Sequence, residues 1–174
     1  MLNKSFSRPN FSKKNLGGFT LLEVMIAIFF ITVGVLGVFT LIQQTITFAA
    51  ISSSRLVAAY LGQEGIEIVR NIRDGNWLEQ RTNPEISWNA GLAAGDWEAD
   101  YNSQELTQSY GGNFLNLDTK GFYSYAPGTQ TKFKRKITIL AEGTETLKVS
   151  VLVEWSERAR TYQFIVQENL YQWR

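Results

Sequence analysis

A single acid, Glu23, lies at the start of a long apolar stretch, an environment in which an ionised carboxylate is energetically unfavourable. No charged side chain follows it from Val24 to Ser54, and such a stretch exceeds the roughly 20 residues that a helix needs to cross a bilayer core. Between Leu21 and Ile42 there are 15 Leu, Ile, Val and Phe residues. They favour insertion by about 4.5 to 9 kcal/mol, more than the roughly 2.5 to 3.5 kcal/mol that a mid-membrane acid costs. The sequence therefore predicts a membrane-inserted helix whose acid needs a partner.

The residues before this stretch are basic and include two adjacent glycines. Residues 1–18 contain no acid and four cations, namely Lys4, Arg8, Lys13 and Lys14. The positive-inside rule then predicts that the N-terminus stays in the cytoplasm and that the C-terminal part crosses the membrane. A secretory signal is cut after its apolar core, whereas the small-residue pair Gly17-Gly18 lies before it. A cut at this pair would leave the helix attached to the mature chain.

The run Lys13-Lys14-x-x-Gly17-Gly18-Phe19-Thr20-Leu21-Leu22-Glu23-Val24 resembles the cleavage and methylation motif of type IV prepilins and pseudopilins. The shared features are a basic leader, a glycine before the cut, an aromatic residue after it and an acid at the fifth mature position. The resemblance implies that a membrane-embedded prepilin peptidase cuts between Gly18 and Phe19 and that the new N-terminus of Phe19 is methylated. It also implies assembly with other pilin subunits into a helical filament by pilus or secretion machinery in the membrane. There, Glu23 of one subunit would meet the Phe19 amine of its neighbour.

Composition limits the chemistry of the rest of the chain. Removal of residues 1–18 leaves 156 residues, with 13 Lys and Arg against 16 acids and a side-chain net charge of −3, so nothing predicts nucleic-acid binding. Because the chain has no Cys and no His, it has no thiolate or imidazole metal ligands and no His-based catalytic system, and we expect neither a cofactor nor enzymatic activity. Many major pilins close a C-terminal loop with a disulfide. Its absence favours a minor pilin, a pseudopilin or a lineage without such disulfides.

One helix from about Phe19 to Asp74 is predicted to carry the motif, with Gly75 as its C-cap. Residues 19–45 form the transmembrane and filament-assembly half. Over Val57–Ile72 the apolar residues recur every three or four positions, which is typical of an amphipathic helix with one buried face. The segment LGQEGIEIVRNIRDGNW resembles the post-transmembrane helix of minor pilins and of minor pseudopilins of type II secretion.

Two glycines, Gly34 and Gly37, interrupt the apolar half of this helix. They are either ordinary transmembrane glycines that permit close helix packing, or sites where the helix loosens during assembly. In many major pilins a mid-helix proline serves the second role, and here no proline occurs between Phe19 and Asn83.

Residues 76–131 are predicted as a loop, rich in Asn, Gly, Ser and Thr, and resemble in position the variable segment that follows the long helix in pilins. The alternation of Asp96, Glu98 and Asp100 loosely matches the oxygen ligands of a calcium loop but lacks the glycine of an EF-hand, so these residues are weak metal candidates and more typical of a solvated strand or loop. Aromatic residues are dense and are expected to pack the domain against its helix, with an adhesive or sugar-binding surface as the alternative. They are Trp77, Trp88, Trp97, Tyr101, Tyr110, Phe114, Phe122, Tyr123 and Tyr125.

An antiparallel sheet of at least three strands is predicted over about residues 132–168. Alternate residues of the first strand share one face, namely Phe133, Arg135, Ile137, Ile139 and Ala141, and the next two strands alternate in the same way. The connections 142–146 and 156–159 are of hairpin length, although the second lacks the expected Gly. The stripe Val57–Ile72 is the natural cover for the apolar face of the sheet. The predicted fold is α+β, a pilin-like αβ-roll, with a leader (1–18), the assembly half of the helix (19–45) and a globular domain (46–174).

Taken with the resemblance, this organisation predicts a structural subunit of a type IV pilus or related filament, most like a minor pilin. It would pass once through the cytoplasmic membrane before assembly and then become part of an extracellular or periplasmic filament. The alternative within the class is a minor pseudopilin of a type II secretion or DNA-uptake system. A membrane-anchored enzyme or binding domain is the alternative from another class, but the sequence shows no nucleophile motif or phosphate loop that would support it.

Overall fold

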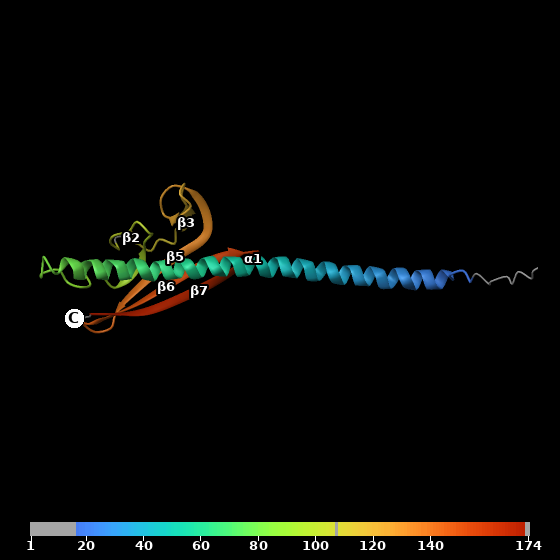
Figure 1. The fold of residues 1–174 in the computed structure, drawn as a ribbon, viewed down its shortest axis with the longest axis horizontal. Helices are drawn as coiled ribbons and strands as arrows, with labels where there is room; N and C mark the ends of the chain where they lie inside the picture. The colour runs from blue at the N-terminus through green and yellow to red at the C-terminus, as the bar shows by residue number, and fades with distance from the viewer. Residues whose placement is uncertain (1–16, 107, 173–174) are drawn as a thin grey trace, which may run out of the picture. The chain divides into compact units, whose positions relative to one another are not determined.

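The structure, a computed structural model, describes residues 17–106 and 108–172. The chain forms two compact units, one that ends at Ile46 and one from Thr47 onward. One helix, α1, belongs to both units, and the strands belong to the second (Figure 1). The elements in chain order are α1 Leu21–Glu79, β1 Gly95–Glu98, β2 Gln108–Ser109, β3 Phe114–Leu117, β4 Tyr123–Ser124, β5 Thr129–Ala141, β6 Thr146–Glu157 and β7 Arg160–Tyr171.

Helix α1 is longer than the sequence predicted. The prediction that Gly75 ends it is wrong, because α1 continues to Glu79 and Gly75 does not adopt the positive φ of a C-cap glycine. Side chains in the last turns are held by the chain that follows. Asn76 Nδ2 donates to the carbonyls of Trp88 (3.0 Å) and Ala90 (2.8 Å). These tertiary hydrogen bonds extend the helix past a residue that would otherwise favour its end.

Strand β5 is the centre of a seven-stranded sheet. On one side it pairs with β6, which in turn pairs with β7. Its other edge is shared, with β3 beside residues 129–134 and β1 beside residues 137–139. Strand β2 extends the sheet from β1, and β4 extends it from β3. All these pairs are antiparallel, and the predicted α+β fold, one long helix packed on a C-terminal antiparallel sheet, is confirmed.

The predicted sheet over residues 132–168 corresponds to β5, β6 and β7. The prediction of a loop over residues 76–131 is wrong in part, because β1, β2, β3 and β4 lie within it. Each of these strands has only two to four residues. Such strands are too short to show the two-residue alternation that marks a strand in a sequence.

The long hairpins differ in their turns. The β5–β6 connection contains Gly143 with a φ of 81°, whereas the β6–β7 connection is only Arg158 and Ala159, with φ values of 49° and 62°. These φ signs match a type I′ turn, which usually takes Asn or Gly. Strand β6 pairs with β7 without a break from Thr146 to Glu157, and this pairing holds the turn in place although it contains neither Asn nor Gly.

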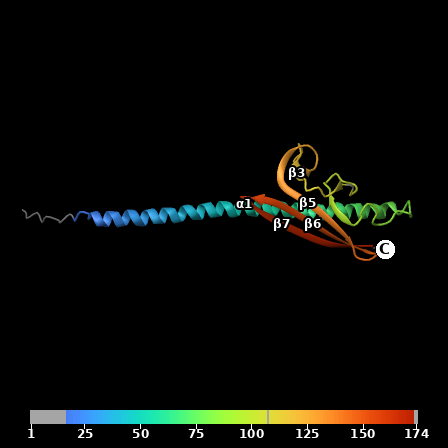
Figure 2. The same ribbon diagram turned by 180° about the vertical axis from the view of Figure 1, so that it is seen from behind.

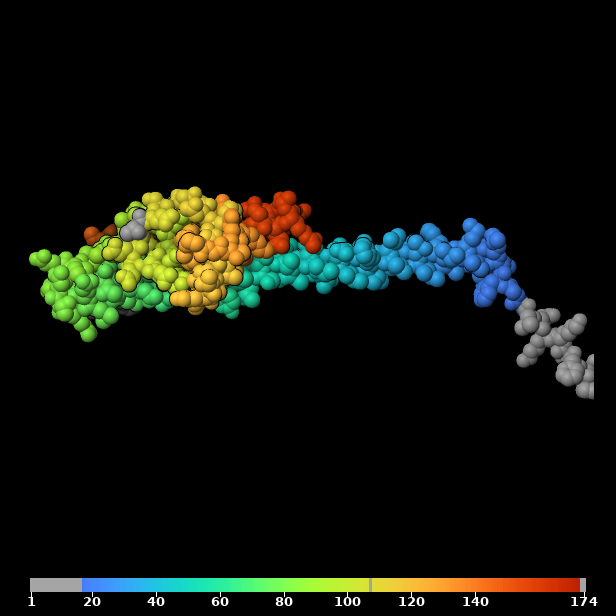
Figure 3. All heavy atoms as spheres, turned by 90° about the horizontal axis from the view of Figure 1, so that it is seen from above, coloured from blue at the N-terminus to red at the C-terminus, as the bar shows by residue number. Residues whose placement is uncertain are grey.

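The second half of α1 and the sheet enclose one apolar core. Figures 1 and 2 show β5, β6 and β7 beside this part of the helix, and Figure 3 shows the yellow and orange segments covering its green turns. Helix residues such as Leu61 and Val69 belong to the same buried cluster as alternate strand residues such as Ile137 and Val151, and all are almost fully buried. The predicted cover of the sheet by the stripe Val57–Ile72 is therefore present. Ala141, predicted to face inward with its strand, is exposed at the end of β5.

Close approach between α1 and β6 depends on Gly65. A Cβ added at Gly65 would lie 2.8 Å from Cγ1 of Val151, whereas one added at Gly75 would meet nothing within 4 Å. Gly65→Ala should lower the free energy of unfolding, because overpacking costs about 1 to 3 kcal/mol and Ala in a helix regains only about 1 kcal/mol over Gly. Gly75→Ala should instead raise the free energy of unfolding by about 1 kcal/mol, because the added methyl group meets no neighbour and Ala favours the helix over Gly. Urea unfolding of both variants measures the difference, and equal stabilisation by the two substitutions would contradict the packing described here.

Candidate functional site

The predicted cleavage point lies just before the first turn of α1. Residues 17–20 are not helical, and Phe19 is 81% exposed. The helix starts with Thr20 as its N-cap, since the backbone N–H of Glu23 donates to Thr20 Oγ1 (3.3 Å) and that of Val24 to the Thr20 carbonyl (3.2 Å). The Gly18–Phe19 peptide bond is therefore accessible and outside the helical hydrogen bonds. Lys13 and Lys14 of the predicted motif lie outside the described residues.

The role of Thr20 was missed by the sequence predictions, although its signal is present. Thr20 and Glu23 have the spacing of a capping box, a Ser or Thr followed three residues later by Glu or Gln. The structure contains the Thr20 half of that arrangement. An acid in the first turn also interacts favourably with the positive end of the helix dipole, so Glu23 has a local structural role besides any role in assembly.

Beyond Glu23, residues 24–46 of α1 present an apolar surface. Each of them is exposed, and α1 is long and apolar enough to cross a membrane. The hydroxyls of Thr32 and Thr40 donate to carbonyls of their own helix, those of Ile28 and Gly37, both at 2.8 Å. These hydrogen bonds give both hydroxyl protons an acceptor in an environment where no water is available.

A shallow groove follows this surface at Gly34. Its lining includes Ile31, Val35, Val38 and Phe39, and its volume is about 480 Å³. An added Cβ at Gly34 or at Gly37 would meet nothing within 4 Å. The groove is therefore open space on one helix, of the kind that lets a second helix approach closely.

The weak metal candidates bind separate partners. Glu98 is buried, and its carboxylate accepts hydrogen bonds from Gln108 Nε2 (3.0 Å), the backbone N–H of Gly111 (3.1 Å) and both nitrogens of Asn113 (2.9 and 2.8 Å). These bonds tie β1 to the chain around β2 and β3. A carboxylate with four donors around it is satisfied without a cation.

Asp96 and Asp100 lie in different surroundings from Glu98. Asp96 accepts a hydrogen bond from Thr138 Oγ1 (2.6 Å) and pairs with Lys136 Nζ (3.4 Å), both on β5. Asp100 accepts from the backbone N–H groups of Asn102 (3.1 Å) and Tyr125 (3.0 Å). Within residues 17–106 and 108–172, no three Asp or Glu side chains come together as a metal site.

The aromatic residues of segment 76–131 divide into two sets, apart from the half-buried Tyr110, whose ring centroid lies 5.7 Å from Lys136 Nζ. Trp88 is buried, and Trp77, Trp97, Tyr123 and Tyr125 pack against the core. The other set is at least one-third exposed and consists of Tyr101, Phe114 and Phe122. Within it the rings of Tyr101 and Phe122 are 5.0 Å apart, and the Tyr101 hydroxyl donates to Asp118 Oδ2 (2.9 Å). Most of these aromatics thus serve the fold, and a small exposed cluster remains.

Arg135 of β5 is fully buried although it carries a charge. Its Nη1 donates to the carbonyl of Leu61 (3.2 Å) and to Glu64 Oε2 (3.1 Å), and its Nη2 donates to the carbonyl of Ala99 (2.5 Å). These bonds join the helix, the central strand and the chain after β1. Arg135 therefore holds the fold together, and its charge is compensated by Glu64, which is partly exposed.

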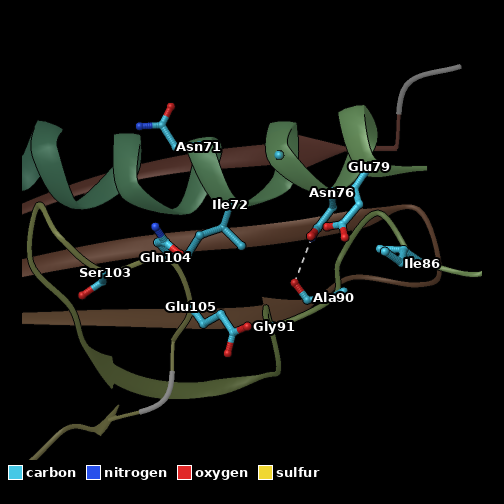
Figure 4. Close-up of a pocket in the computed structure, with 11 residues that line it drawn as sticks. Asn71, Ile72, Asn76, Glu79, Ile86, Ala90, Gly91, Ser103, Gln104 and Glu105 are labelled. Atoms are coloured by element: carbon cyan, nitrogen blue, oxygen red, sulfur yellow. Dashed lines mark hydrogen bonds between the residues drawn. The ribbon is translucent and has the colours of Figure 1, made fainter. Parts of the chain in front are cut away.

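A pocket of about 540 Å³ lies between the last turns of α1 and two loops, residues 86–91 and 103–105 (Figure 4). Glu79 and Glu105 supply carboxylates, and Figure 4 shows Asn76 directed from the helix toward Ala90. The described residues that line it include no Lys or Arg. Ser103 donates to Asp100 Oδ1 (3.3 Å) and is part of a turn. The side chains of this pocket can both accept and donate hydrogen bonds.

Comparisons with family models, with curated proteins and with solved structures find no match to this chain.

Proposed function

We propose that this protein is a structural subunit of a type IV pilus or related filament, most like a minor pilin, cut from its leader between Gly18 and Phe19. The observation that supports this best is the arrangement around α1. The motif is followed directly by one unbroken helix, whose first half exposes apolar side chains and whose second half packs on an antiparallel sheet. The membrane anchor of an enzyme would need no such motif. A secretory signal would be cut after its apolar core, so the mature chain would lose the apolar helix.

Before assembly, α1 passes once through the cytoplasmic membrane with its N-terminus in the cytoplasm. This is supported by the four cations and no acid in residues 1–18 and by the absence of charge from Val24 to Ser54. In the filament, the same side chains that faced lipid pack against neighbouring subunits. The groove at Gly34 offers room for a ridge of another helix.

Glu23 is the residue proposed to set the position of each subunit. Cleavage gives Phe19 a cationic amine, and both Phe19 and Glu23 are exposed in the single subunit. In a bundle of staggered helices, the carboxylate of one subunit can pair with the amine of the next, which relieves two charges that an apolar environment penalises. A buried polar pair of this kind fixes axial register, as it does in coiled coils.

Glu23→Val tests this proposal. The variant should still be cut, inserted and folded, because removal of an acid lowers the cost of insertion. Its content in sheared filaments, relative to membranes, should fall at least about 100-fold, since breaking a buried pair costs about 3 to 5 kcal/mol and about 1.4 kcal/mol is a factor of ten. Quantitative immunoblotting of both fractions measures this ratio.

The matched control is Glu23→Asp, which keeps the charge on a side chain one methylene shorter. It should recover incorporation only in part. Equal incorporation of the wild-type protein and Glu23→Val would show that apolar packing alone recruits the subunit, and the charge-pair mechanism would be wrong.

A further inference from the structure

A groove lies where the β6–β7 turn meets the first turns of α1 in the second unit. Its volume is about 560 Å³, and its lining combines apolar side chains, those of Phe48, Ile51 and Tyr162, with two arginines, Arg158 and Arg160. Phe48 is 65% exposed. Tyr162 stacks on the buried Trp155, with ring centroids 5.6 Å apart. The groove therefore combines a rigid aromatic part with a cationic part.

The cationic part is compensated by the protein only through the carboxylate of Glu157, whose pKa is also lowered by the neighbouring charge of Arg158. Arg158 and Arg160 are exposed, and neither forms an ion pair with any residue that the structure describes. The acid of the lining, Glu157, is already engaged by Lys132 Nζ and by Ser54 Oγ (2.9 Å). Those hydrogen bonds, that from Lys132 first, lower the pKa of the Glu157 carboxyl below its ordinary value. The guanidinium of Arg160 and the part of the Arg158 guanidinium that does not bind Thr47 thus remain available to an anion.

The groove also lies directly beside the end of the apolar segment. Arg158 Nη1 donates to Thr47 Oγ1, and Thr47 follows Ile46 without a break in the helix. At 1.5 Å per residue, the part of the helix in which every residue is exposed, Val24 to Ile46, is about 34 Å long, close to the roughly 30 Å of a bilayer core. A membrane that holds this segment would have its surface near Thr47, and therefore near Arg158.

We propose that the β6–β7 turn binds the phosphate groups of anionic phospholipids at the membrane surface where α1 emerges. A guanidinium group matches a phosphate with two parallel hydrogen bonds, and Tyr and Phe side chains favour the interface between headgroups and acyl chains. The site would hold the globular unit against the membrane until the subunit leaves for the filament. This inference rests on the proposed membrane insertion of residues 21–46.

The test uses the full chain, which has no cysteine of its own. Ala159→Cys places one thiol at the turn for a fluorescent label. The protein is reconstituted into vesicles of phosphatidylcholine, with or without phosphatidylglycerol, that contain a lipid with a nitroxide quencher on its headgroup. Fluorescence lifetimes then give the ratio of quenched to unquenched molecules. We expect this ratio to rise when phosphatidylglycerol is present and to fall again at high salt.

Arg158→Gln/Arg160→Gln in the labelled chain should lower this ratio by roughly fivefold for each arginine, about 25-fold for the pair, as expected for cations near an anionic surface. Arg158→Lys/Arg160→Lys keeps both charges but loses the paired hydrogen bonds, so it should restore the ratio in part, and this recovery excludes misfolding as the cause of the loss. The charge-matched control Arg81→Gln/Lys148→Gln removes two cations elsewhere and should behave as the wild type.

Alkaline extraction of the same vesicles measures membrane insertion separately. Release of the protein from the vesicles would contradict the proposed membrane insertion, and this inference would fall with it. If the protein is retained but the quenched fraction is the same with and without phosphatidylglycerol, this inference alone would be overturned. Retention without quenching, together with loss of the Gln variant from filaments, would also overturn it and would assign the arginines to acidic groups of a neighbouring subunit.

Discussion

A chain that begins at Thr47 should fold and remain in solution, whereas the same chain carrying Val69→Asp should be unfolded. Every residue of the apolar core lies at Val57 or beyond, so the shortened chain keeps its whole core. Val69 is completely buried between α1 and the sheet. An aspartate there loses the burial of the valine and brings an unpaired charge into the core, which together cost more than about 4 kcal/mol of a typical 5 to 15 kcal/mol total.

Circular dichroism and urea unfolding of the two shortened chains measure this difference. The matched control is Gln63→Asp, which adds the same charge on the exposed side of the same helix and should leave the fold intact. A folded Val69→Asp chain would mean that α1 does not pack on the sheet as described. Aggregation of the wild-type shortened chain would mean that its core needs the apolar first half.

Gly18→Glu should abolish processing, so that only the uncut precursor accumulates. The residues around the predicted cut are exposed and not helical, and glycine leaves the peptide bond open to a peptidase at the membrane face. A glutamate side chain would occupy that space and add a charge close to the membrane, where charge is costly. Mass spectrometry of the intact protein distinguishes a precursor that starts at Met1 from a product that starts at Phe19.

The wild-type chain is the positive control and should carry one methyl group on its Phe19 amine. Gly17→Ala is the matched control, since it adds only one methyl group and leaves the residue next to the cut unchanged. A mature N-terminus at Phe19 in Gly18→Glu would show that the cleavage motif was assigned wrongly.

The parts of the fold with a clear period could be predicted from the sequence. The alternation along β5, β6 and β7 and the stripe Val57–Ile72 each repeat over many residues, so the helix, the long strands and their common core were recoverable. The position of Arg135 on the inward face was part of that alternation. Its pairing with Glu64 was not, because the two residues lie 71 positions apart and nothing local links them.

The remaining features depend on contacts that no short segment encodes. Strands β1 and β3 form because the free edge of β5 is long enough to pair with both, and β2 and β4 then pair with them, although these four segments have weak preferences of their own. Gly75 stays helical because Asn76 finds acceptors in a loop 12 and 14 residues further on. At the candidate cleavage site, by contrast, the Thr20 cap was readable, because a capping box is a purely local arrangement.

The distance along the chain between α1 and its partners in the sheet has a consequence for synthesis. The hydrogen-bond partner of Ser54, Glu157, is synthesised 103 residues later, and that of Arg70, Glu168, is synthesised 98 residues later. At about 5 to 20 residues per second, a ribosome needs roughly 5 to 20 seconds to close that interval. During this time the sheet that covers Leu61, Val69 and Ile72 is incomplete. The nascent chain therefore exposes an apolar helix face that chaperones and other chains can bind. A pause in translation between β5 and β7 therefore prolongs the exposure of this apolar helix face.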